Sequence, residues 1–245
     1  MKGTRPAGLE AEREVSAWVR NMFGQVAPRY DFLNHLLSFN IDRYWRARTV
    51  KRVRAVLERP EVRVLDLCCG TGDLMLALQD QSRTDVMGTD FCHPMLVAAR
   101  RKSAGAAPLF EADALQLPLP DSSLDLVTVA FGFRNLANYE KGLAELMRVL
   151  RPGGVAAILE FSQPPNRLFA SLYNFYSRHI LPRLGGAISG SKDAYSYLPE
   201  SVRKFPGAEV LAQRMSELGF CDVGFERMTF GIVALHLGTR PAQRT

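Results

Sequence analysis

The chain contains no apolar stretch long enough to cross a membrane, since each apolar run is shorter than the ~18 residues that a spanning segment needs. The opening residues, MKGTRPAGLEAEREV, carry charges and lack the apolar core of a signal peptide. The sequence therefore predicts a cytoplasmic protein. Its 245 residues, 47% of them hydrophobic, are typical of one α/β domain with an elaboration.

Cysteine and histidine are also scarce, with four of each in the chain. The cysteines form no CxxC pair and the histidines have no ligand spacing, so the sequence predicts no metal site. Adjacent Cys68 and Cys69 favour two small buried thiols at a strand end, with a redox role as the alternative. The net charge of +6 is a mild excess that suits an anionic membrane surface or a nucleic acid without requiring either.

Apolar segments of strand length alternate with helical patterns through the middle of the chain. Strands are expected at residues 62–67, 85–91, 108–111, 124–131 and 155–161, and helices at 72–81, 94–104 and 139–150. A further helix at 208–218 and two strands at 222–228 and 232–239 follow. Because this alternation is typical of parallel sheets covered on both faces, it predicts a Rossmann-like, doubly wound, mostly parallel sheet of about seven strands.

Two additions accompany the expected sheet within one structural domain. Residues 1–60 form a helical N-terminal cap, and residues 162–205 form an insertion in the main unit of residues 61–245. Such sheets bind ligands at the carboxyl ends of their strands, so both additions are expected to cover that edge.

Within the cap, residues 41–59 predict an amphipathic helix with one apolar and one basic face. The helix packs on the sheet with its basic face in solvent, or that face contacts a membrane surface. The apolar face holds Trp45, Val50, Val53, Val56 and Leu57, and the basic face holds Arg43, Arg48, Lys51, Arg52, Arg54 and Arg59.

The stretch VLDLCCGTGD, residues 64–73, joins the first expected strand to a helix through two glycines. It lacks the lysine of a P-loop and the third glycine of a dinucleotide site, and Asp66 and Asp73 would repel a pyrophosphate. A cationic, phosphate-free nucleoside suits it better, and S-adenosylmethionine is such a molecule. Asp66 would hold the cationic part, while Gly70 and Gly72 admit the methionine chain against bare backbone. The sequence thus predicts carboxylates rather than lysines around this loop.

Two later strand ends carry further candidates for the same ligand. Asp90 ends the second strand, where an acid accepts hydrogen bonds from ribose hydroxyls, in NAD as well as in S-adenosylmethionine. Asp113 and Ala114 end the third strand, where the carboxylate of Asp113 can accept from the adenine amine. A plain turn cap is the alternative for Asp113, but its register with Asp66 and Asp90 favours the ligand.

These motifs resemble those of known enzymes. VLDLCCGTGD, GTDF and AELMRVLRPGG resemble class I S-adenosylmethionine-dependent methyltransferases. FNIDRYWR, AFGFRN, LEFSQP, YSYLPESVRKFPG and GIVALHLG narrow the resemblance to the menaquinone/ubiquinone biosynthesis C-methyltransferases, nearer the menaquinone branch, over residues 13–240. The resemblance implies methylation of a prenylated demethylmenaquinol and places cofactor contacts on Thr71, Asp90, Asp113 and Ala114. Ala130 departs from the family, many members of which have a serine there.

The segment FGFRN, residues 131–135, suggests the acceptor chemistry. Nucleic-acid amine methyltransferases usually carry an Asn/Asp-Pro-Pro-aromatic stretch there, so no nucleic-acid partner is expected. A quinol carbon becomes nucleophilic when its hydroxyl ionises, and a guanidinium favours the phenolate. We therefore expect Arg134 to stabilise the phenolate and Asn135 to orient it. The proton acceptor stays open, and its candidates are Tyr30, Asp31, His179 and Tyr197.

The insertion carries an apolar stripe at helical spacing. The stripe lines a tunnel for the prenyl tail, dips into a bilayer, or belongs to the core. It comprises Leu168, Phe169, Leu172, Tyr173, Phe175, Tyr176, Ile180 and Leu181.

Several alternatives for function remain open at this point. They are a benzoquinol acceptor of the ubiquinone pathway, a phenolic or sterol-like acceptor, an NAD-dependent oxidoreductase, and a noncatalytic scaffold of quinone synthesis. Peripheral contact with an anionic membrane and a homo-oligomer are both compatible with the sequence.

Overall fold

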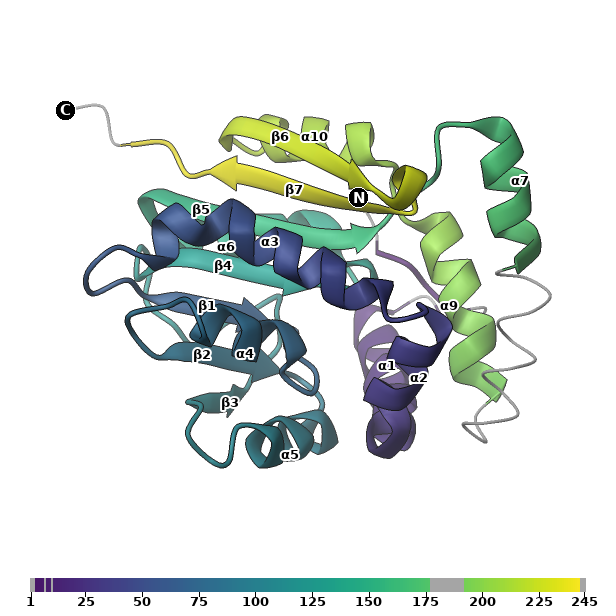
Figure 1. Ribbon diagram of the computed structural model, residues 1–245, viewed down its shortest axis with the longest axis horizontal. Coiled ribbons are helices and arrows are strands. Elements are labelled where there is room, and N and C mark those ends of the chain that lie inside the picture. Colours follow the sequence, from purple (N-terminus) through teal and green to yellow (C-terminus); the bar gives the residue numbers. More distant parts are fainter. Residues whose placement is uncertain (1–2, 7, 10, 177–191, 243–245) are drawn as a thin grey trace.

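The computed structural model describes residues 3–6, 8–9, 11–176 and 192–242, and its strands form one seven-stranded sheet with helices on both faces (Figure 1). The strand order is β3-β2-β1-β4-β5-β7-β6, with β7 antiparallel to both neighbours and the other pairs parallel. This confirms the predicted fold. The strands are β1 Val64–Leu67, β2 Val86–Asp90, β3 Leu109–Glu111, β4 Leu124–Ala130, β5 Leu150–Phe161, β6 Cys221–Met228 and β7 Val233–Thr239.

The helices have nearly the bounds that the sequence predicts, and β5 is the main difference. It starts at Leu150, directly after helix α6, whereas the sequence predicted a strand only from residue 155. The register with β4 shifts in this added part, which contains the Pro-Gly-Gly segment. The α-helices are α1 Glu12–Val26, α2 Tyr30–Leu37, α3 Ile41–Leu57, α4 Asp73–Gln79, α5 His93–Lys102, α6 Tyr139–Val149, α7 Arg167–Phe175, α9 Lys192–Lys204 and α10 Ala208–Glu217. Three short 3-10 helices are η1 Ala27–Arg29, η2 Phe133–Asn135 and η4 Thr229–Gly231.

The central strands are apolar on both faces because helices cover both. Leu126, Val127 and Val129 of β4 are fully buried. One face packs against α6 through residues such as Leu143, and the other packs against α3 and α4 through residues such as Val53. This rigid, buried sheet fixes the positions of the strand ends that carry the site.

Helix α3 buries all five residues of its predicted apolar face, as the packing interpretation requires. Much of its basic face is neutralised, since Arg48 and Arg52 pair with Glu226 and Arg54 pairs with Glu58. In the described part of the chain, no helix is both long and apolar enough to span a bilayer.

The helices α1, α2, α7 and α9 gather beyond one end of the sheet, at the arrowheads of β4 and β5 (Figure 1). Helix α1 contacts both α5 and α9, and the rings of Trp18 and Tyr197 lie 5.1 Å apart between α1 and α9. Segments from the cap and from the insertion thus enclose the carboxyl ends of the strands.

Candidate active site

The loop between β1 and α4 has backbone conformations that suit glycine. Gly70 and Gly72 have φ values of +56° and +89°, and a Cβ at Gly72 would lie 3.1 Å from the Met75 side chain. A Cβ at Gly70 would meet only Tyr30, at 3.8 Å, so this part of the loop presents bare backbone to open space. The amide of Gly70 donates to Asp90 Oδ2 at 2.9 Å, which ties the loop to the end of β2.

Two buried carboxylates lie at the ends of β1 and β2. Asp66 is 1% exposed and accepts a hydrogen bond from the Thr128 hydroxyl at 2.6 Å, while Asp90 accepts from the amides of Gly70 and Cys92. Burial raises the pKa of Asp66 to about 7 and that of Asp90 to about 6. A bound cation would favour the ionised form of both.

A cavity at the carboxyl edge of β1–β4, the sheet-edge cavity, has four of the predicted cofactor residues in its lining. They are Gly70, Asp90, Asp113 and Ala114. Its empty volume is about 660 Å³, including the mouth that is open to solvent. Asp113 also accepts from the amide of Leu115 at 2.9 Å, so it serves as a turn cap as well.

A smaller neighbouring space, the loop cavity, is lined by Asp66, Thr71 and again Gly70. The two cavities share Tyr30, Cys68, Gly70, Ala130 and Phe131 in their walls. The structure therefore brings all six predicted cofactor residues to two adjoining spaces.

The prediction of a loop without lysine is wrong in one respect. Lys102 of α5 reaches the loop and lies 2.6 Å from both Asp31 and Asp73, and it also contacts Thr71. Two carboxylates balance its charge, so it is not free to meet a phosphate. Asp31 in turn accepts from the Thr71 hydroxyl, so Lys102 and the loop together hold this carboxylate in place.

The thiols of Cys68 and Cys69 are free, and burial raises the pKa of both. Protonated thiols are weak nucleophiles, which favours the structural interpretation. A Cβ at Gly132 would lie 2.4 Å from Cys68 Cβ, so this loop and the end of β4 touch directly.

A third and larger space, the apolar cavity, opens between α2, α3, α7 and the ends of β4 and β5. Its volume is about 1490 Å³, including the part open to solvent. Aromatic rings gather in its wall, with the centroid of Phe131 4.9 Å from Phe161 and 5.8 Å from Trp45. Tyr30 and Phe131 line this cavity and both smaller ones.

Arg134 lines the apolar cavity as part of a buried ion pair. Its Nη1 donates to Glu160 Oε1 at 2.9 Å and to the carbonyl of Phe131, and its amide donates to Glu160 Oε2. The guanidinium lies 5.2 Å from the Phe161 ring centroid. Sequence reasoning missed Glu160, although it lies within the quoted LEFSQP segment. The pair has no net charge, which makes Arg134 a weaker phenolate stabiliser than a free guanidinium.

Asn135 and Tyr30 are the two remaining candidates for catalysis that reach a cavity. Asn135 lines the sheet-edge cavity, and its buried Oδ1 has no hydrogen-bond partner among the described residues. Burial raises the pKa of Tyr30, so its hydroxyl stays protonated and acts as a donor rather than as a proton acceptor. Tyr197 packs against Trp18 away from the three linings, and His179 lies outside the described residues.

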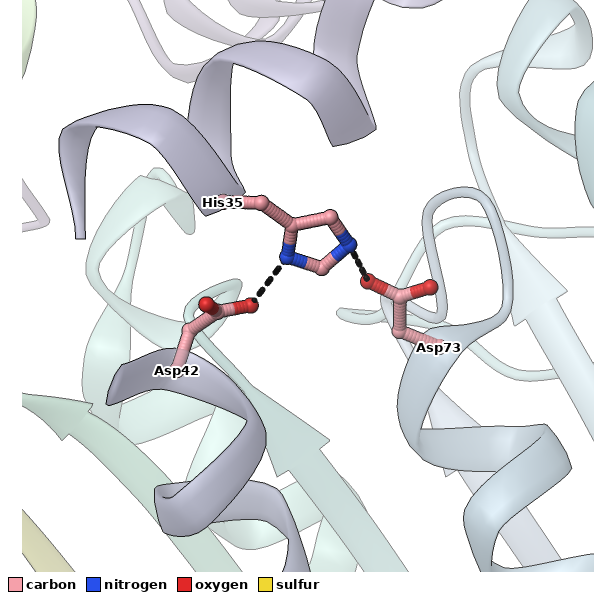
Figure 2. Close-up of side chains that lie close together, drawn as sticks. All are labelled: His35, Asp42 and Asp73. Atoms are coloured by element: carbon pink, nitrogen blue, oxygen red, sulfur yellow. Dashed lines mark hydrogen bonds and ion pairs between the residues drawn. The ribbon is translucent and has the colours of Figure 1, made fainter. Parts of the chain in front are cut away.

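A polar cluster joins α2 and α3 to the glycine loop (Figure 2). His35 lies between two carboxylates, with Nδ1 2.8 Å from Asp42 and Nε2 3.9 Å from Asp73. Arg46 pairs with both carboxylates. The guanidinium of Arg46 already supplies positive charge to both carboxylates. The arrangement is therefore a polar link between the cap and the loop rather than a metal centre.

Comparison with known proteins adds the family. The model of the ubiE/COQ5 methyltransferase family matches residues 10–240. A demethylmenaquinone methyltransferase of Thermus thermophilus is 51% identical over 224 residues, which cover 90% of this chain and 100% of that protein. A protein of the same name from Deinococcus radiodurans is 46% identical and covers 91% of this chain and 92% of its own. The ubiquinone/menaquinone biosynthesis C-methyltransferase UbiE of Geobacter sulfurreducens is 43% identical, with 91% and 88% covered.

Solved structures share the fold at much lower identity. An S-adenosylmethionine-dependent methyltransferase of Thermotoga maritima has a TM-score of 0.64 and 17% identity, covering 90% of this chain and 98% of its own. Phosphoethanolamine N-methyltransferase 2 of Haemonchus contortus, in complex with S-adenosylhomocysteine, has a TM-score of 0.56 and 15% identity over 78% of this chain and 52% of its own. On the match over nearly its whole length, this chain belongs to the ubiE/COQ5 methyltransferase family.

Proposed function

We propose that the protein transfers a methyl group from S-adenosylmethionine to a ring carbon of a prenylated demethylmenaquinol, which gives menaquinol. One observation carries the proposal: Tyr30 and Phe131 line the two cavities of the buried carboxylates and also the large apolar cavity. A polar donor and a lipid acceptor can therefore meet at one wall. The names of the relatives from Thermus and Deinococcus support this acceptor, and the family gives no support to an NAD-dependent oxidoreductase.

The donor residues suit a cationic nucleoside without phosphate. When bound, S-adenosylmethionine supplies an electrophilic methyl group on a sulfonium. Asp66 faces the loop cavity and would balance positive charge there, while Asp90 would accept from ribose hydroxyls. Asp113 and Ala114 would contact the adenine. Gly70 leaves room for the amino-acid part, with Thr71 beside it.

The acceptor ring fits the aromatic wall of the apolar cavity. A free phenol has a pKa of about 10, so ionisation at neutral pH needs help from the site. Arg134 would supply positive charge, which Glu160 reduces, and Tyr30 would donate a hydrogen bond to the phenolate. Asn135 would orient the ring, directly or through water, since its Oδ1 is an unused acceptor within the described site. Positioning against the donor then contributes much of the rate.

The prenyl tail would occupy the rest of the apolar cavity. Five residues of the predicted apolar stripe line that cavity, namely Phe169, Leu172, Tyr173, Phe175 and Tyr176. Leu168 lies outside it, 82% exposed. A lipid acceptor also favours a cytoplasmic enzyme that binds peripherally to an anionic membrane, and a homo-oligomer remains compatible with this arrangement.

Transfer of a labelled methyl group from S-adenosylmethionine tests the function. Three acceptors are compared: a demethylated naphthoquinol and a demethylated benzoquinol under reducing conditions, and the oxidised naphthoquinone. We expect label in the naphthoquinol, and none in the oxidised compound because it has no hydroxyl to ionise. Absence of label in both quinols would overturn the proposed function, and preference for the benzoquinol would move it to the ubiquinone pathway.

A further inference from the structure

Large apolar side chains are exposed around the mouth of the apolar cavity. Their exposed fractions range from 38% to 82%, and contiguous apolar surface of this kind marks an interaction site. Below it is called the apolar rim, and it comprises Phe39, Ile41, Tyr44, Leu168, Leu172, Phe175 and Phe230.

The apolar rim is continuous with the cavity behind it. Phe39, Ile41, Leu172 and Phe175 line the cavity and are exposed as well, so the lining extends outward to the surface. Leu168 lies one turn before Leu172 on α7, and α7 lies at the end of the molecule where α3 begins (Figure 1). The apolar lining thus reaches the surface on these sides.

Direct contacts hold the two sides of the apolar rim together. The Tyr176 hydroxyl donates to the carbonyl of Leu37 at 3.1 Å, and the rings of Phe39 and Tyr176 lie 6.4 Å apart. On the other side, the ring of Phe230 lies 5.0 Å from that of Phe169. Segments far apart in the sequence therefore form one surface.

Backbone conformation at the apolar rim is unusual. Phe39 and Phe230 have φ values of +53° and +55°, a region that bulky residues rarely adopt. Such strain persists only where the surrounding structure enforces it, and it gathers at functional sites. At Phe39 and Phe230 the strained backbone leaves a phenyl ring 73% and 77% exposed.

The segments that form the apolar rim expose no acidic side chain. Residues 32–44, 166–176 and 229–232 contain a single acid, Asp42, which is 3% exposed and paired with Arg46. Arg43, between two residues of the apolar rim, is exposed. An apolar surface with cationic and no exposed anionic groups matches an anionic bilayer.

We propose that the apolar rim docks on the surface of an anionic phospholipid bilayer, so that the cavity mouth faces the lipid. The tail of a lipid acceptor then passes from the bilayer into the cavity without crossing water. This inference rests on the proposed function for the nature of the acceptor. It places the membrane contact at the cavity mouth, where α3 contributes only Arg43 of its basic face. Farther along that face, Arg48, Arg52 and Arg54 already have acidic partners.

Co-sedimentation with vesicles of phosphatidylcholine and phosphatidylglycerol tests the docking surface. The test variant is Leu168→Ser/Phe230→Ser, with Tyr44→Ser as a second probe across the mouth; none of these residues lines the cavity. Matched controls are Val210→Ser, a 45% exposed apolar residue on α10, and Lys51→Ser on the basic face of α3. We expect about tenfold weaker vesicle binding for the double variant, a smaller loss for Tyr44→Ser, and wild-type binding for Val210→Ser.

Methyl transfer to a short-tailed, water-soluble demethylated naphthoquinol without vesicles separates the two proposals. We expect equal rates for the wild type and the double variant there, and a slower double variant only when a long-tailed quinol is presented in vesicles. Wild-type vesicle binding by the double variant, with soluble activity intact, would overturn the docking proposal alone. Vesicle binding that is lost only in Lys51→Ser would also overturn the docking proposal. A concentration-dependent dimer that the double variant abolishes would overturn it as well. Failure to methylate any quinol would instead overturn the proposed function.

Discussion

The affinity of the free protein for S-adenosylmethionine should rise with pH between 6 and 8. The reason lies in Asp66 and Asp90, whose pKa values burial raises to about 7 and about 6. A cation binds best when both are ionised, so binding at lower pH must first remove their protons.

The magnitude follows from these two pKa values. At pH 6 about ten in eleven molecules have Asp66 protonated and about half have Asp90 protonated, whereas both are largely ionised at pH 8. The apparent dissociation constant at pH 6 should therefore be about twentyfold that at pH 8. Asp66 contributes about tenfold of this and Asp90 about twofold.

Isothermal titration with S-adenosylmethionine from pH 5.5 to 8.5 measures how the apparent dissociation constant changes with pH, which is called the pH slope below. Asp66→Asn should remove most of it, and Asp85→Asn, an exposed acid at the amino end of the same strand as Asp90, should keep it. 5′-Methylthioadenosine, which lacks the charge, should show a much smaller pH slope in the wild type. A wild-type change of less than threefold, or an unaltered pH slope in Asp66→Asn, would refute the assignment of Asp66 to the cation.

The stability of the ligand-free protein should depend on pH in the opposite sense. The folded pKa of Asp66 is above its unfolded value of 3.8, so its contribution to stability is complete below about pH 4. That contribution is lost as pH rises through about 7. The difference in unfolding free energy between the wild type and Asp66→Asn, measured across this pH range, separates the effect of Asp66 from that of other titrating groups. With S-adenosylmethionine bound, the pH dependence should be reversed.

Two further changes test the surroundings of the site. Gly132→Ala should destabilise the protein and abolish donor binding, because the new Cβ would lie 2.4 Å from Cys68 Cβ; Gly224→Ala, with nothing within 4 Å, should lose no donor affinity in the same titration. Glu160→Gln should lower the unfolding free energy by about 3–5 kcal/mol, since it leaves the buried charge of Arg134 without its acidic partner. Arg134→Gln/Glu160→Gln removes both charges, and we expect at least about tenfold slower methyl transfer with donor affinity retained; a smaller drop would count against a role for Arg134 in turnover.

The sheet and the candidate residues at its carboxyl edge could be predicted from the sequence because the sequence patterns that indicate them are local. Each strand is a short apolar run, and parallel strands bring their carboxyl ends to one edge. Asp66, Asp90 and Asp113 therefore had to lie near one another once the strands were recognised. The glycine loop was readable for the same reason, since Gly70 and Gly72 serve a turn that begins and ends within a few residues.

Contacts between distant segments could not be read in this way. Lys102 meets Asp31 from 71 positions away, and no periodicity links a residue at the end of α5 to one in α2. The pairing of Arg134 with Glu160 depends on β4 and β5 being neighbours in a register that places Ala130 opposite Leu159. Tyr30 was a site candidate from the sequence and lines all three cavities, yet its burial, which keeps the hydroxyl protonated, depends on packing that the sequence does not display.

The cavities proposed for the donor and for the acceptor are built by different parts of the chain. Strand ends and the first loop form the two cavities proposed for the donor, and the sheet that positions them is shared with structures of only 15–17% identity. The cap and the insertion supply α2, α3 and α7 to the apolar cavity, and these segments can change without altering the strands. Phe131 stands at the boundary with a φ of +57°, in the wall of all three spaces. Acceptor specificity in this fold should therefore be set by the helices around Phe131, while donor recognition stays with the carboxylates behind it.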